Sequence, residues 1–130
     1  MSDVAVPAGR RWTHVGVWIV RGLLALAFLG AGGVKLYGVP MMVDEFHHIG
    51  LGQWFRYLTG SLEIIGAILL LLPRKAGFGA LLLICIMIGA VITHLSVIGG
   101  SPVPAIVLLA LNVLVAYSER EAIASLAKAF

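Results

Sequence analysis

The segment TGSLEIIGAILLLL, from Thr59 to Leu72, is a helix-length apolar run that carries one carboxylate, Glu63. An ionisable group at membrane depth is costly unless it is paired, hydrated or protonated, so Glu63 marks a candidate functional site, the alternative being a structural ion pair. Gly60, Gly66 and Ala67 lie three or four residues away on the same helix face. Small residues allow a neighbouring helix to approach closely or leave room for a ligand. The rest of the chain must therefore supply Glu63 with partners.

The composition is that of a protein embedded in the lipid bilayer. Of the 130 residues, 61% are hydrophobic and 12% are charged, and the mean hydropathy is +1.06. These values, with several long apolar runs, indicate an integral membrane protein rather than a soluble domain. The net charge of +3 does not indicate nucleic-acid binding, because the basic residues lie where membrane topology signals belong. The single cysteine, Cys85, excludes an intramolecular disulfide and a cysteine-based metal cage.

Four apolar segments predict four membrane-spanning helices. They cover about residues 13–36, 54–72, 76–98 and 103–117, and they belong to one transmembrane domain that comprises residues 1–130. The fold class is therefore all-α, an integral membrane four-helix bundle. The tail from Ser118 reads as a further amphipathic helix.

The segment between the first two spans is too polar to cross a membrane. Pro40 suits the first turn of a helix and Gly50 suits a C-terminal cap, and four apolar residues between them share one face, namely Met42, Val43, Phe46 and Ile49. We expect a short amphipathic helix at the membrane interface. His47 and His48 are neighbours on a helix and point about 100° apart, so they cannot chelate a metal together.

The basic residues predict the orientation in the membrane. Those that flank one side are Arg10, Arg11, Arg74, Lys75, Arg120 and Lys128, whereas Arg56 alone is expected in a loop on the other side. By the positive-inside rule, both termini are cytoplasmic and the N-terminal segment is an uncleaved, mobile extension. We expect the plasma (inner) membrane of a prokaryote.

Five polar groups fall inside the predicted spans: Arg21, Lys35, Glu63, His94 and Asn112. At a rise of 1.5 Å per residue, Glu63 and Asn112 lie roughly 13 Å below the outer surface and His94 about 6 Å below it. Arg21 precedes Lys35 by about four helical turns on the same face. We therefore predict a polar cluster in the outer half of the bundle, with Glu63 between Lys35 above and Arg21 below.

Each of these polar residues also has a simpler interpretation. Lys35 can extend to the lipid headgroups, and His94 can be a hydrogen-bonded packing residue. Asn112 can link two helices through a hydrogen bond. Arg21 is too deep to reach the headgroups comfortably, so a partner within the protein is the better explanation.

Several of these motifs, in order, resemble the DoxX-like family. They are RGLLALAFLGAGGVKL, GVPMMVDEFHHIGLG, TGSLEIIGAILLLLPR and the later THL, which together cover residues 21–95. The resemblance implies a four-helix membrane bundle. It also implies a link to sulfur-related or quinone-related oxidoreductase assemblies, to membrane complexes that handle oxidative stress, or to receptor assembly. The chain lacks paired histidines for haem, paired cysteines and a nucleotide-binding loop, so neither haem nor a metal is indicated.

Three classes of function remain open. The leading hypothesis is binding of a lipophilic or quinone-like molecule, or a role as the membrane subunit of a redox assembly, with polar contacts from Lys35, Glu63 and His94. A proton-coupled transporter that uses Glu63 is the second class, and a purely structural partner of a membrane protein or a homo-oligomer is the third. An enzyme acting alone could use Glu63 or His94 as acid or base, but the sequence shows no nucleophile and no metal set.

Overall fold

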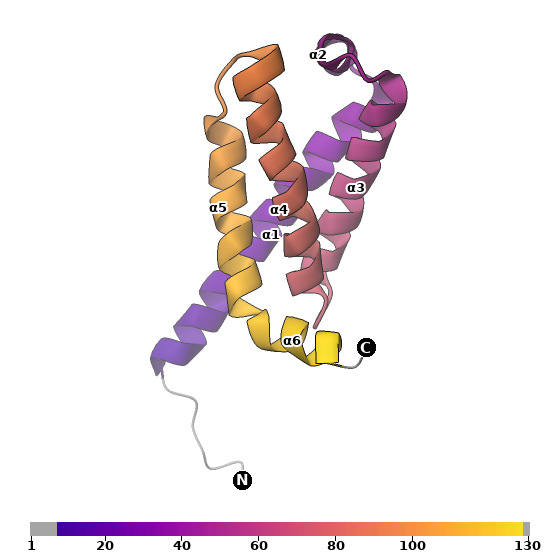
Figure 1. Cartoon of the computed structure of the whole chain (residues 1–130). Helices are drawn as coiled ribbons and strands as arrows, with labels where there is room; N and C mark the ends of the chain where they lie inside the picture. Colours follow the sequence, from indigo (N-terminus) through magenta and orange to yellow (C-terminus); the bar gives the residue numbers. More distant parts are fainter. Residues whose placement is uncertain (1–7, 129–130) are drawn as a thin grey trace.

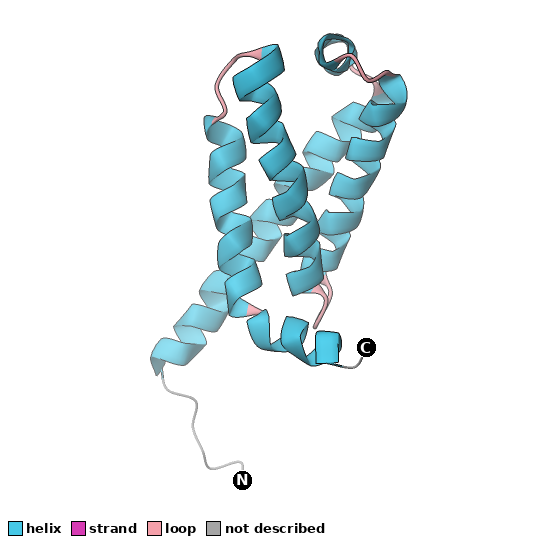
Figure 2. Cartoon of the chain, in the orientation of Figure 1, coloured by secondary structure: helices cyan, strands magenta, loops and turns pink. Residues whose placement is uncertain are grey.

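The computed structural model describes residues 8–128. In this part of the chain the regular secondary structure is all helical, without a strand, and short loops connect the helices (Figure 2). The elements in order are α1 (Ala8–Tyr37), α2 (Pro40–Ile49), α3 (Gln53–Leu71), α4 (Ala76–Thr93), the π-helix η1 (His94–Ile98), α5 (Val103–Ser118) and α6 (Arg120–Lys128). The all-α prediction is confirmed. The expectation of a mobile N-terminal extension falls mostly on residues 1–7, which lie outside the described residues.

Three helical segments are long and apolar enough to cross a membrane: Arg11–Tyr37, Gln53–Leu71 and Ala76–Ile98. They agree with the first three predicted spans to within about two residues. The fourth, α5, is apolar but has only 16 residues. At 1.5 Å per residue it is about 24 Å long, shorter than a typical hydrocarbon core of about 30 Å.

The four long helices form a closed bundle. α1 packs against α3, α3 against α4, α4 against α5, and α5 against α1 (Figure 1). The centre is filled by completely buried side chains, including Phe28, Leu70, Leu83 and Val115. Burial of this apolar surface stabilises the arrangement of helices where they face one another.

Glycines set the spacing between α3 and its two neighbours. A Cβ atom added at Gly60 would lie 3.0 Å from the carbonyl oxygen of Gly32 in α1. One added at Gly66 would lie 2.6 Å from the side chain of Leu83 in α4. The small residues around Glu63 thus allow close helix approach, as their spacing predicts, on two different sides of α3.

Two buried arginines connect α1 and α3 at opposite ends. Arg21 of α1 donates hydrogen bonds to the carbonyl oxygens of Leu70 (2.6 Å) and Leu72 (3.1 Å) at the end of α3. Arg56 of α3 donates one to the carbonyl oxygen of Lys35 in the last turn of α1. The last carbonyls of a helix lack intrahelical donors and carry partial negative charge, so a cation is favourable there. Each helix therefore caps the end of the other.

A short helix lies across each end of the bundle (Figure 1). At one end, α2 begins at Pro40 and stops at Gly50, whose φ of +86° is readily adopted by glycine. This confirms the predicted amphipathic helix, in which Phe46 is buried and His47 and His48 are exposed. At the other end, α6 confirms the predicted tail helix and places Ile123 against Gly77 of α4.

Candidate functional site

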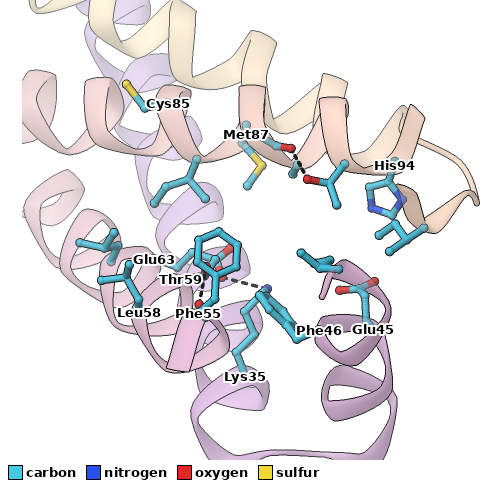
Figure 3. A pocket seen from close by; sticks show the side chains of 17 residues that line it. Lys35, Glu45, Phe46, Phe55, Leu58, Thr59, Glu63, Cys85, Met87 and His94 are labelled. Atoms are coloured by element: carbon cyan, nitrogen blue, oxygen red, sulfur yellow. Dashed lines mark hydrogen bonds and ion pairs between the residues drawn. The ribbon is translucent and has the colours of Figure 1, made fainter. Parts of the chain in front are cut away.

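A cavity of about 300 Å³ lies at the α2 end of the bundle, between α3 and α4 with its extension η1 (Figure 3). Most of its lining is apolar and comes from residues such as Phe46, Phe55, Leu62 and Met87. The polar side chains that line it are Lys35, Glu45, Thr59, Glu63, Thr93 and His94. An apolar pocket with a few convergent polar groups is the usual form of a small-molecule site, and this volume is at the lower end of that class.

An ion pair between α1 and α3 is the most buried polar feature of this cavity. Lys35 Nζ lies 2.8 Å from Glu63 Oε1, and the two side chains are 14% and 2% exposed. Apart from this ion pair, Oε1 has no hydrogen-bond partner within the described residues. Lys35 Nζ also lies 3.5 Å from the carbonyl oxygen of Ala31. Glu63 therefore has charge compensation but unused hydrogen-bonding capacity.

Arg56 holds the backbone from which Lys35 extends. Besides its bond to the Lys35 carbonyl oxygen, Arg56 donates to Gln53 Oε1 at 2.7 Å. Gln53 in turn donates to the carbonyl oxygen of Val43 in α2, at 3.1 Å. This chain of bonds joins the end of α1, the start of α3 and α2 around the cavity. The expectation that Arg56 lies in an outer loop is wrong, since it lies inside α3 and is 5% exposed.

His94 lies where α4 changes into a π-helical turn. Its Nδ1 is 2.8 Å from the carbonyl oxygen of Gly99, just after this turn. A carbonyl oxygen can only accept, so Nδ1 carries the hydrogen. His94 and Glu45 also line a second hollow of about 320 Å³ between α2 and η1. π-Turns within α-helices are often found at functional sites.

The structure brings together three of the five predicted site residues, Lys35, Glu63 and His94, around one cavity. The predicted pairing of Arg21 with Glu63 is wrong. Besides its bonds to α3, Arg21 lies 3.8 Å from Glu119 and stacks over the ring of Trp18 at 3.6 Å. These partners are at the α6 end of the bundle, where the last carbonyls of α3 lie within its reach.

Asn112 does not line the cavity either. It is completely buried in α5 and its Nδ2 donates to the carbonyl oxygen of Leu108, at 2.8 Å. Its Oδ1 is buried without a hydrogen-bond partner. The placement of Asn112 in the cluster is therefore wrong, because a depth similar to that of Glu63 does not imply the same face of the bundle.

Sequence reasoning missed Glu45, Thr59 and Thr93 as cavity residues. Glu45 is on the predicted amphipathic helix. Thr59 lies one helical turn before Glu63, and Thr93 lies one helical turn after Gly89. The signal available was the position of the two threonines at the same end of their spans as His94. Figure 3 shows Glu45 and His94 at one end of the cavity and Cys85 at the other.

Within residues 8–128, no three histidine, cysteine, aspartate or glutamate side chains are grouped so that they could hold a metal ion. Cys85 is exposed and unpaired with another cysteine. The polar side chains that line the cavity offer hydrogen bonds and charge to a ligand.

Comparison with known proteins gives two matches. The profile of the DoxX-like family matches residues 19–118. The uncharacterized protein YdgD of Bacillus subtilis (strain 168) is 36% identical over 76 residues, which cover 55% of this chain and 67% of YdgD. No solved structure shows a significant match.

Proposed function

The chain belongs to the DoxX-like family, and we propose that this integral membrane protein binds a lipophilic molecule in the cavity between α3 and α4. The polar head of the ligand lies beside Lys35 and Glu63, and its apolar body lies along the apolar lining. Quinone-like molecules belong to this class of ligand. The observation that carries the proposal is the combination of an apolar cavity with a buried carboxylate, Glu63, whose one polar partner within the described residues is the Lys35 ammonium.

The experiment compares which small molecules co-purify with two glycine variants. Gly89 lines the cavity, and a Cβ atom added there meets no other atom within 4 Å. Gly89→Leu should therefore fold and fill part of the cavity. Gly30→Leu is the matched control, because Gly30 is equally open, is also helical, and does not line the cavity.

Both variants and the wild type are purified in mild detergent, and retained molecules are identified by native mass spectrometry. We expect a lipophilic molecule with the wild type and Gly30→Leu, and a loss of at least about tenfold with Gly89→Leu. Equal retention by all three proteins, or retention by none, would contradict the proposal. Co-purifying protein subunits in the same samples would support a role in a redox assembly or as a structural partner.

A proton-coupled transporter is the second candidate. It is favoured by the position of Glu63 deep in the bundle and by the second hollow between α2 and η1, which shares Glu45, His94 and Ile98 with the cavity. This candidate requires that a pH gradient drives flux of the retained molecule into proteoliposomes and that Glu63→Gln abolishes this flux. A molecule that binds but is not moved would exclude it.

We further propose that α5 completes a single four-span transmembrane domain and that both termini are cytoplasmic in a prokaryotic inner membrane. Support comes from Arg74, Lys75, Arg120 and Lys128, which all lie at the α6 end. At the α2 end, the buried Arg56 binds protein groups and is not a loop charge, so the asymmetry is larger than the sequence indicates.

Labelling of single cysteines tests this orientation in a Cys85→Ala background. Cysteines at Ser2, Lys75 and Lys128 should react only from the cytoplasm, and one at Ser101 only from outside. The reverse pattern would place the cavity in the inner half of the membrane.

A further inference from the structure

The two threonines of the cavity have already used their hydrogens. Thr59 Oγ1 lies 2.8 Å from the carbonyl oxygen of Phe55, and Thr93 Oγ1 lies 2.6 Å from that of Gly89. A carbonyl oxygen has no hydrogen to give, so the hydroxyl is the donor in both bonds. Each threonine therefore offers a ligand only the lone pairs of its oxygen.

The histidine is restricted in the same way. Because Nδ1 of His94 donates to the carbonyl oxygen of Gly99, the neutral ring has an unprotonated Nε2. This nitrogen can only accept a hydrogen bond. The hydrogen bond to Gly99 thus fixes both the orientation of the ring and the role that it offers to a ligand.

The charged groups add further acceptors. Glu45 and Glu63 are both carboxylates, and Glu63 Oε1 has no partner among the described residues besides the Lys35 ammonium. Among the described residues that line the cavity, Lys35 has the one strong hydrogen-bond donor of a side chain. Its ammonium is directed to Glu63 and to the carbonyl oxygen of Ala31. The cavity therefore presents five acceptor side chains and a lysine that is already engaged.

We infer that the cavity, as the ligand site proposed above, selects a lipophilic molecule whose head donates hydrogen bonds, a hydroxyl or an ammonium group, over one whose head only accepts them. A carbonyl or ether head would face carboxylate, hydroxyl and imidazole lone pairs and leave them unpaired. A site whose buried polar groups lose their partners rejects such an analogue strongly. Among quinone-like molecules, this favours the reduced dihydroxy form.

The test uses pairs of probes that share one apolar body. The first pair is decylhydroquinone and its dimethyl ether, in which methylation removes both O–H donors and keeps the ring and both oxygens. The second pair is decylammonium and decyltrimethylammonium, in which the charge is kept and the N–H donors are lost. Dissociation constants are measured by titration calorimetry, under argon, on the full-length protein in lipid nanodiscs, with empty nanodiscs as the reference for partition into lipid.

In one or both pairs, we expect the probe with hydrogen-bond donors to bind at least about tenfold more tightly than its methylated partner. The pair that shows this difference identifies the head group of the ligand as a hydroxyl or an ammonium group. If both members of each pair bind with equal affinity, the inference fails although the proposed function stands. If no probe binds above the level of the empty nanodiscs, both fail.

Two variants separate hydrogen bonding from the bulk of the added methyl groups. Thr93→Val removes one acceptor and keeps the side-chain shape, so it should weaken the donor probe severalfold and leave its methylated partner unchanged. Ser96→Ala is the matched control, because the Ser96 hydroxyl makes the same kind of bond, to Ile92 at 2.6 Å, but does not line the cavity. An unchanged preference in Thr93→Val would show that size alone discriminates and would overturn the inference.

Discussion

Removal of Lys35 should destabilise the protein more than removal of Glu63. Lys35→Met leaves a carboxylate that is 2% exposed without its counter-ion, whereas Glu63→Gln leaves an ammonium that is 14% exposed and on a long, flexible stem. Removing one partner of a buried pair costs about 3–5 kcal/mol, and replacing both partners can be nearly neutral. We therefore expect a loss of about 3–5 kcal/mol for Lys35→Met and about half of that for Glu63→Gln.

The double variant Lys35→Met/Glu63→Gln should recover most of the loss, which corresponds to a coupling energy of about 3–6 kcal/mol. The free energy of unfolding is measured by titration with a denaturing detergent in mixed micelles, followed by tryptophan fluorescence. A second cycle, Arg21→Met with Glu63→Gln, is the control, because Arg21 binds the end of α3 at Leu70 and Leu72 whereas Glu63 pairs with Lys35. If the first cycle were additive within about 0.5 kcal/mol, Lys35 and Glu63 would not interact and the description of the site would be wrong.

Two further predictions concern the contacts between helices. Arg56→Met should lower the free energy of unfolding by about 3 kcal/mol, because it leaves the Lys35 carbonyl oxygen and Gln53 without their hydrogen-bond donor. A loss below about 1 kcal/mol in the same unfolding assay would contradict this role. Gly79→Ala should lower the free energy of unfolding by about 1–3 kcal/mol, because the added Cβ would lie 2.8 Å from the carbonyl oxygen of Gly66. Gly22→Ala should instead stabilise its helix by up to about 1 kcal/mol, because a Cβ added at Gly22 meets no atom within 4 Å. Equal effects of the two alanines would show that α3 and α4 are not in close contact.

The sequence predicts the helices better than it predicts the partners of the charged groups. Long apolar runs locate the spans, and Pro40 and Gly50 mark both ends of α2, because these signals are local. The pairing of Lys35 with Glu63 also follows from their heights in the bundle. The partners of Arg21 could not be predicted in this way. They are the backbone carbonyl oxygens of Leu70 and Leu72, which are free only because α3 ends there, and every residue has such a carbonyl whatever its type.

Two other features could not have been predicted. Arg56 is expected in a loop but is buried in α3, where it binds the Lys35 carbonyl oxygen of α1, a tertiary contact that no local sequence pattern indicates. The π-helical turn at His94 has no recognised residue pattern, and it determines both the partner of the histidine and its place beside α2. The direction of a polar side chain at a helix end depends on helix crossing and on such irregular turns, which are tertiary properties.

Arg21 and Arg56 bind α1 to α3 at both ends of α3, and this limits how a molecule could reach the cavity. Sliding or tilting of one of these helices along the other would break buried hydrogen bonds at one end or the other, so this half of the molecule is fixed in register. The other walls of the cavity come from α4, α2 and η1. Of these, α2 and η1 are short, and η1 has no buried residue. If a ligand enters by a movement of helices, α2 and η1 are therefore the elements that move, and the Lys35–Glu63 pair stays in place.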